Sequence, residues 1–281
     1  MCIFLNTQLE TKKSTIMSAF PILSDKHIEE SSVFSPENLL REARRQKLLP
    51  VNKVPKICVL DPDGDIVRTL VTEHRAERDT NWPCYHTELY IFSHGNFRLG
   101  IIGCAVGGSF AVLVAEELFA SGCELLISMT SAGQILEIGD PPYFVFIEKA
   151  LRDEGTSYHY LPPAEFSSIS PQLRSILDDA FANVSLKVYR GATWTTDAPF
   201  RETREAIEHC KSLGILAVDM EAAGLYAFAE ARNKSVVCMA HVTNRMAIAE
   251  GDFEKGTDAG SRDALHIIGL IAEAWSHYHE K

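Results

Sequence analysis

The sequence lacks the features that mark secreted, membrane-spanning or metal-binding proteins. Its seven cysteines are scattered without a CxxC pair, and this odd set fits a reducing compartment. Cys84 and His86 lie close together, but no second ligand pair follows at zinc spacing, so we predict no metal site. No apolar run is long enough to span a membrane, and residues 1–17 do not resemble a signal peptide. We therefore expect a cytoplasmic protein without a membrane partner.

Positive charge is also scarce. The formal net charge is -11 and the isoelectric point is about 5.4. The run "REARRQK" (41–47) is dense in cations, but it is typical of the solvated face of a helix. An acidic chain without a basic patch is a poor partner for nucleic acid, although it can still bind small anions locally.

What remains is the composition of a globular protein whose strand-like and helix-like segments alternate. The 281 residues are 46% hydrophobic and contain no repeat, low-complexity tract or linker. Strands are predicted over 56–62, 97–106, 123–133, 142–151, 186–196 and 235–244, and helices over 107–122, 200–214, 219–232 and 260–280. This alternation predicts an α/β fold, in which one domain has a central mixed, largely parallel sheet flanked by helices. We expect a partly flexible extension over 1–32 and a catalytic domain over 33–281.

Ligands of such folds bind at the carboxyl ends of strands, so the loops that follow strands are the informative ones. Four loops qualify: 60–65, 104–109, 130–133 and 241–245. In the second loop, Gly107 and Gly108 would let backbone N–H groups approach a ligand at the start of a helix, although a simple tight turn is an equal alternative. The third loop, "TSAG", carries two hydroxyl side chains before a glycine.

The stretch "GILAVDMEAAGLYAFAEAR" (214–232) is typical of a buried helix, yet it contains two carboxylates, Asp219 and Glu221. A buried carboxylate is unfavourable unless it is paired. Asp219 could be the cap of the helix, and Glu221 could favour the positive end of the helix dipole. Alternatively the carboxylates face an internal ligand such as a sugar, whose vicinal hydroxyl groups donate two hydrogen bonds to one carboxylate.

Four of these segments together resemble the nucleoside phosphorylase superfamily, which contains uridine phosphorylase, hexameric purine nucleoside phosphorylase and methylthioadenosine nucleosidase. They are "VGG" before a helix, "TSAG", "VDMEAAGLYAFA" and "HVTNR", in that order. The resemblance extends over residues 33 to 275, and "DMEAAG" is its most specific part. The segments "GTSYHYLPPAEF" (155–166) and "GATWTTD" (191–197) are most similar to the uridine phosphorylase branch.

The resemblance implies a role for each residue near the sugar. Met220 would pack on the ribose, and Glu221 would accept hydrogen bonds from its hydroxyl groups. Asp219 would lie near the base or the helix cap. Ser131 and Gly133 would lie beside the ribose and any phosphate.

The resemblance also implies a base subsite. Phe200 would stack on the base, and Arg201 or Arg204 would reach its edge. Purine-cleaving members carry a catalytic Asp after the last strand, whereas this chain has Asn244 followed by Arg245. That arrangement is the one in uridine phosphorylases, where the arginine stabilises negative charge on the departing pyrimidine. Asn244 is thus expected to bind substrate and Arg245 to be catalytic, together with Glu221.

The chain departs from the family at the phosphate. The positions of its three phosphate-binding arginines hold Gly64, Thr87 and Ser128, and the position of a histidine from a neighbouring subunit holds Ser35. Each charge-assisted contact to phosphate is worth roughly 1.5–3 kcal/mol, so losing three should weaken phosphate binding severely. Arg68 or Arg98 could substitute for them, but nothing in the sequence shows it.

Three functions follow from these residues. The first is a uridine phosphorylase-like enzyme with an atypical phosphate site, where the loop of Gly107, Gly108 and Ser131 positions the acceptor. The second is a nucleosidase that uses water instead. The third is a non-catalytic nucleoside-binding protein that keeps the fold. We expect no cofactor, with phosphate as the candidate co-substrate, and the resemblance implies a homo-oligomer, dimer or hexamer.

Overall fold

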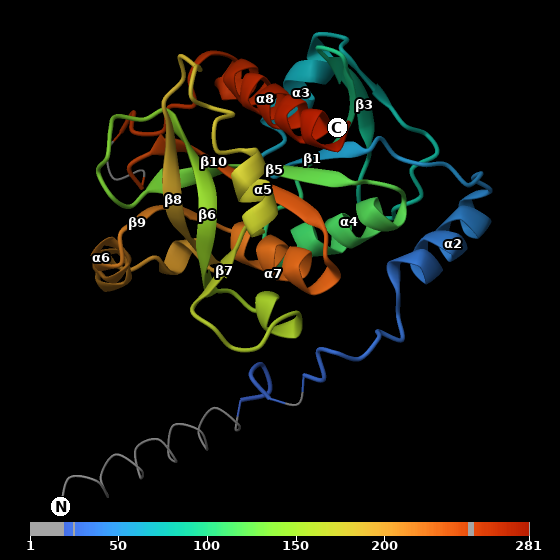
Figure 1. Ribbon diagram of the computed structural model, residues 1–281, viewed down its shortest axis with the longest axis horizontal. Helices are drawn as coiled ribbons and strands as arrows, with labels where there is room; N and C mark the ends of the chain where they lie inside the picture. Colours follow the sequence, from blue (N-terminus) through green and yellow to red (C-terminus); the bar gives the residue numbers. More distant parts are fainter. Residues whose placement is uncertain (1–19, 25, 247–249, 281) are drawn as a thin grey trace, which may run out of the picture.

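The computed structural model describes residues 20–24, 26–246 and 250–280. Most of the extension predicted over 1–32 therefore lies outside the described residues. The rest forms an α/β fold in which helices cover both faces of one mixed sheet (Figure 1). The predicted fold class is confirmed.

The sheet contains a closed ring of strands and an open extension. The ring follows the order β10-β6-β8-β9-β5 and closes because β5 also pairs with β10, while β1-β4-β3-β2 extends outward from β5. Within the described residues, five strand pairs are parallel and five are antiparallel. The strands are β1 (Ile57–Asp61), β2 (Ala76–Arg78), β3 (Tyr90–His94), β4 (Phe97–Gly103), β5 (Leu125–Gln134), β6 (Tyr143–Asp153), β7 (Phe166–Ser168), β8 (Val188–Thr196), β9 (Ile215–Asp219) and β10 (Ser235–Asn244).

Strand β5 brings the ends of two other strands together. Its residue Gly133 is in register with Val218 of β9 on one side and with Asn244 of β10 on the other. A Cβ atom on Gly133 would lie 2.7 Å from the sulfur of Met246 and 3.3 Å from a methyl group of Val218. A larger residue here would make Met246 and Val218 move, because the three strands converge at this point and their carboxyl ends share one edge of the sheet.

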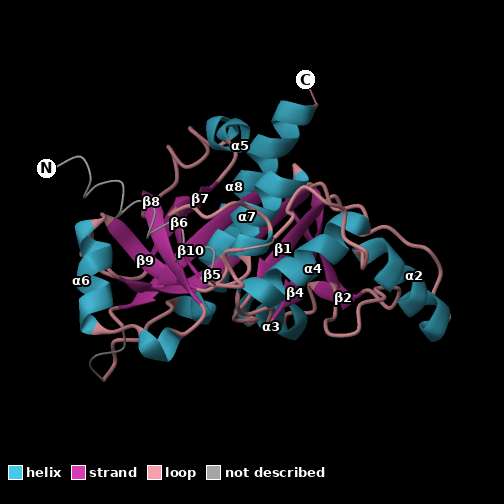
Figure 2. Cartoon of the chain, turned by 90° about the horizontal axis from the view of Figure 1, so that it is seen from below, coloured by secondary structure: helices cyan, strands magenta, loops and turns pink. Residues whose placement is uncertain are grey.

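The helices form two groups on opposite faces of the sheet. On one face α8 contacts α3 and α5, and on the other α4 contacts α2 and α7 (Figure 1). Helix α6 packs on β9 at one end of the molecule, and α2 lies at the other end (Figure 2). No helix among the described ranges combines the length and hydropathy that crossing a bilayer requires. The helices are α2 (Pro36–Lys47), α3 (Asp65–Thr72), α4 (Gly108–Ala120), α5 (Pro171–Ile176), α6 (Arg204–Ser212), α7 (Ala222–Arg232) and α8 (Ser261–His279), with short 3-10 turns η1 (Ser157–His159), η2 (Pro199–Arg201) and η3 (Thr257–Gly260).

The prediction of one buried helix over 214–232 is wrong in its first part. Residues Ile215–Asp219 form strand β9, and helix α7 begins only at Ala222. All five residues of β9 are buried, so the strand has the same continuous apolar pattern as a buried helix, and periodicity cannot separate the two. The consequence for function is that Met220 and Glu221 lie at a strand-to-helix junction instead of on a helix.

Candidate functional site

A cavity of about 330 Å³ opens where β5, β9 and β10 end. The predicted residues that line it are Ser131, Gly133, Phe200, Asp219, Met220, Glu221 and Asn244. A larger cavity of about 930 Å³ lies between α4 and the segment before α2, and none of the predicted catalytic or substrate-binding residues lines it. The structure therefore brings residues from distant parts of the sequence to the smaller cavity.

Glu221 is the buried acid of this cavity. One of its carboxylate oxygens accepts the backbone N–H of Gly107 at 2.8 Å, and the other accepts the Thr130 hydroxyl at 2.9 Å. Gly107 has φ = 87°, a conformation that favours glycine, which explains the residue type beside the acid. Burial, with a contribution from the charge of Asp219, raises the pKa of Glu221 to about 7, although its hydrogen bonds act in the opposite direction.

Asp219 holds the start of helix α7. Its Oδ1 atom accepts the backbone N–H groups of Glu221 at 3.0 Å and Ala222 at 2.9 Å, and the Thr195 hydroxyl at 2.9 Å. Burial raises its pKa, and these hydrogen bonds oppose the shift. These are the contacts expected if Asp219 caps the helix. They also fix the backbone that carries Glu221.

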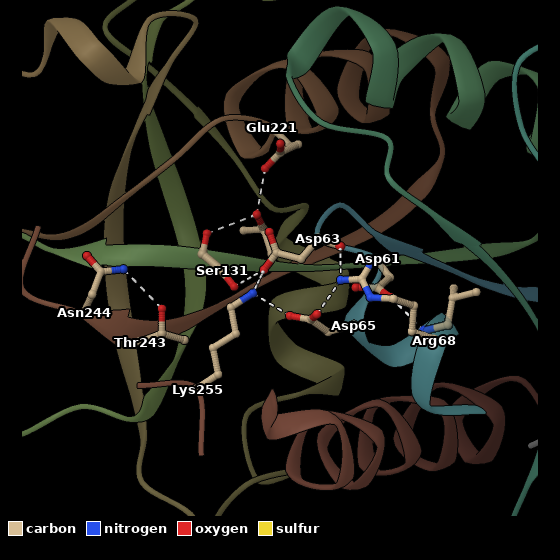
Figure 3. Close-up of polar contacts among 11 residues, drawn as sticks. Asp61, Asp63, Asp65, Arg68, Ser131, Glu221, Thr243, Asn244 and Lys255 are labelled. Carbon is tan, nitrogen blue, oxygen red and sulfur yellow. Dashed lines mark hydrogen bonds and ion pairs between the residues drawn. The ribbon is translucent and has the colours of Figure 1, made fainter. Parts of the chain in front are cut away.

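A second group of charges lies at the same cavity, on the side of the loop after β1. The Ser131 hydroxyl donates a hydrogen bond to the carboxylate of Asp63, which also accepts Lys255 Nζ at 2.9 Å (Figure 3). Lys255 and Arg68 each form an ion pair with Asp65, at 2.5 Å. Both cations are therefore already bound to carboxylates.

The three positions where the resemblance expects arginines contribute no charge. Gly64 precedes α3 with φ = 75°, and Ser128 is buried within β5. Thr87 accepts a hydrogen bond from the indole of Trp82 at 3.0 Å. Two cations lie close by. The Arg68 guanidinium lies next to Gly64, and Lys255, which was not predicted from the sequence, reaches Asp63 beside Ser131 (Figure 3).

On the opposite side of the cavity, Asn244 is fixed by its neighbours. Its side-chain oxygen accepts the backbone N–H of Met246 at 2.9 Å, and its amide nitrogen donates to the Thr243 hydroxyl at 3.2 Å. Phe200 is fully exposed at the rim, where its ring is accessible to a ligand.

Several predicted residues lie beside the cavity without lining it. Arg245 forms an ion pair with the exposed Asp140, and neither Arg201 nor Arg204 belongs to the lining. Gly108 begins α4, and Gly107 takes part through its N–H bond to Glu221. Their roles toward a substrate stay predictions.

Four residues at the site were not predicted from the sequence: Asp63, Thr130, Glu202 and Lys255. Asp63 and Thr130 belong to two of the four stretches predicted as loops after strands, 60–65 and 130–133, and this position was the available signal. The structure places Thr130 within β5, so the prediction of a loop over 130–133 is wrong. Glu202 lines the cavity beside Phe200, and burial raises its pKa to about 7. Lys255 lies in an irregular segment before α8, where no pattern in the sequence indicates a functional residue.

Comparisons with known proteins show the family of this chain. Residues 56–273 match the model of the family described as the phosphorylase superfamily. The chain is 24% identical to a uridine phosphorylase of Thermococcus kodakarensis over 248 residues, which cover 78% of this chain and 87% of that protein. It is 27% identical to a guanosine phosphorylase of Halorubrum lacusprofundi over 212 residues, or 74% and 79% of the two chains.

A solved structure supports the fold independently. The crystal structure of uridine phosphorylase from Vibrio fischeri superposes with a TM-score of 0.69 at 20% identity, covering 80% of this chain and 95% of that one. At this identity the likeness concerns the fold. Because the family model matches most of the chain, including every strand and loop that forms the cavity, the protein belongs to the phosphorylase superfamily.

Proposed function

We propose that this protein cleaves the N-glycosidic bond of a nucleoside and that Glu221 binds the ribose hydroxyl groups. The observation that carries the proposal is a buried carboxylate at the cavity. One oxygen accepts the Gly107 N–H, and the other accepts the Thr130 hydroxyl and, at 3.4 Å, the Met220 N–H. An ionised carboxylate has about four lone-pair positions, so Glu221 can still accept a hydrogen bond from a ribose hydroxyl group. The uridine and guanosine phosphorylases among its relatives support a nucleoside as the ligand.

The same carboxylate suits the chemistry of this bond. When the bond between the sugar and the base breaks, its electron pair leaves with the base and positive charge develops on the sugar. A fixed negative charge at the ribose stabilises that charge, most strongly in a site from which water is largely excluded. Met220 lines the cavity beside Glu221 and would pack on the sugar.

The residues next to the base favour a base that can leave without receiving a proton from the residue at the end of β10. Asn244 carries no acidic proton, and both ends of its amide already have partners. A pyrimidine nucleoside, uridine first, fits this side, with Phe200 stacked on the base. Arg245 would then have to exchange its exposed partner Asp140 for the base carbonyl.

Two acceptors are compatible with this cleavage. Phosphate would give ribose 1-phosphate, as a uridine phosphorylase-like enzyme does, and water would give free ribose. The ion-paired Asp63 and Lys255 give a specific reason to consider the second reaction.

Release of free base from a panel of nucleosides, measured by chromatography, tests the proposal. Glu221→Ala should lower the rate by at least about a hundredfold, because it removes the buried charge that faces the sugar. Glu124→Ala is the matched control, since Glu124 is an exposed acid paired with Lys56. Wild-type-like activity in Glu221→Ala would refute the role of Glu221. A wild-type protein that releases no base, but whose melting temperature rises with a nucleoside, would instead be a binding protein.

A further inference from the structure

The part of the cavity next to Ser131 has no surplus of positive charge. Two carboxylates, Asp63 and Asp65, face two cations, Lys255 and Arg68, and every member of this group is bonded to another member. Asp61 adds a further acid behind them, and burial raises its pKa to about 7. A phosphate dianion entering here would meet carboxylates and would have to break existing ion pairs.

The hydroxyl of Ser131, which could otherwise bind a phosphate, already contacts a carboxylate. Both Asp63 and Ser131 line the cavity, and the Ser131 hydroxyl donates its hydrogen bond to Asp63. Lys255 Nζ, at 2.9 Å, binds the same carboxylate oxygen and fixes its direction (Figure 3). The Ser131 hydroxyl therefore already donates its hydrogen bond within the protein.

The cavity therefore has two carboxylates with different surroundings. Glu221 is held by Thr130, and Asp63 is held by Ser131, the next residue of β5. Glu221 is 1% exposed, whereas the side chain of Asp63 is 31% exposed and accessible to water. In inverting enzymes that hydrolyse glycosidic bonds, one carboxylate of the pair activates the attacking water, and Asp63 is the carboxylate that water can reach here.

We propose that water is the acceptor and that Asp63 is the catalytic residue that orients and deprotonates it, an inference that rests on the proposed function. The water oxygen forms a bond to the sugar carbon as the bond from that carbon to the base breaks. The electron pair of the broken bond leaves with the base, and one proton of water passes to the Asp63 carboxylate. That proton then returns to the base through solvent, so nucleoside and water give base and free ribose.

The acceptor is tested with the full-length protein and the nucleoside that it cleaves fastest. Base release should be equal in phosphate-free buffer and with added inorganic phosphate, and the sugar product should be ribose carrying oxygen from ¹⁸O-labelled water. Cleavage that requires phosphate and yields ribose 1-phosphate would overturn this inference but would support the proposed function. Absence of cleavage under both conditions would overturn the proposed function and, with it, the inference.

The role of Asp63 needs variants of its own. Asp63→Asn should lower kcat by roughly a hundredfold or more, the range that general-base catalysis contributes. The nucleoside should still raise the melting temperature of this variant, because Glu221 is untouched. Asp178→Asn is the matched control: Asp178 also forms an ion pair, with Arg190 at 3.0 Å, but does not line the cavity.

Chemical rescue distinguishes a catalytic role of Asp63 from a structural one. In Asp63→Ala, added formate can occupy the vacated space and accept the proton from water, so base release should recover severalfold. The same formate should leave the wild-type protein unchanged. Full activity in both Asp63 variants, or lost activity that formate does not restore, would overturn the role of Asp63.

Discussion

The buried acid Glu221 should make the protein less stable as the pH rises. Its pKa is raised from 4.5 to about 7, so between these values the folded protein keeps a proton that the unfolded chain has released. The corresponding stability is fully present below the unfolded value and is lost as the pH rises through about 7. The difference between 4.5 and about 7 corresponds to roughly 3 kcal/mol, as an order of magnitude for a side chain that is almost completely buried.

Glu221→Gln removes this titration while keeping most of the geometry. The amide oxygen can still accept the N–H of Gly107, and the amide nitrogen can donate to the Thr130 hydroxyl. Between about pH 5 and about pH 8, the free energy of unfolding of the wild type should fall by about 2–3 kcal/mol more than that of the variant. Other acids that titrate in this range, such as Asp61, are present in both proteins and largely cancel in the comparison.

Urea denaturation at a series of pH values, with equal m-values for the two proteins, measures this difference. The exposed, ion-paired Glu124 provides the control Glu124→Gln, which should follow the wild-type curve at every pH. If Glu221→Gln also parallels the wild type, the carboxylate ionises in the folded protein as easily as in water. Burial would then be the wrong explanation for its properties.

Three further substitutions test other parts of the structure. Asn244→Asp places an acid beside the base and should raise the ratio of purine to pyrimidine nucleoside cleavage in a substrate panel; an unchanged ratio would exclude a contact between this side chain and the base. Arg245→Ala should lower activity on the preferred base more than on others, and an unchanged substrate ranking would refute its predicted role. Tyr226→Phe removes a hydroxyl that donates to the Ile147 carbonyl at 2.5 Å and accepts the Cys238 N–H at 3.1 Å. Thermal unfolding should show a loss of about 1–3 kcal/mol, and a loss near zero would mean that the orphaned groups find other partners.

The fold class was predictable because most long elements have clear patterns. The helix expected over 260–280 is α8, Ser261–His279, and the strand expected over 235–244 is β10. Strand β9 was not recognised, because a fully buried strand and a buried helix have the same apolar sequence. The short strands β2 and β7, of three residues each, are too brief to give a periodic signal.

The candidate site was predictable where its residues follow strands or belong to a specific motif. Glu221, Met220 and Ser131 were identified in this way, and all three line the cavity. The partners of a charge are harder to predict, because they depend on contacts between distant segments. Lys255 reaches Asp63 across 192 positions of sequence, and nothing near either residue indicates that the two side chains meet.

The closed ring of strands determines when the site can exist during synthesis of the chain. The cavity is lined by segments near residues 62, 131, 200, 220 and 244, and the ring closes only when β9 and β10 have joined β5. A growing chain that ends before β9 already contains Asp63 and Ser131, but it lacks Glu221, the acid proposed to bind the sugar. The binding surface is thus complete only after β9 and β10 have been synthesised. A nucleoside would recognise only the finished ring, so it should slow unfolding without guiding the early stages of folding.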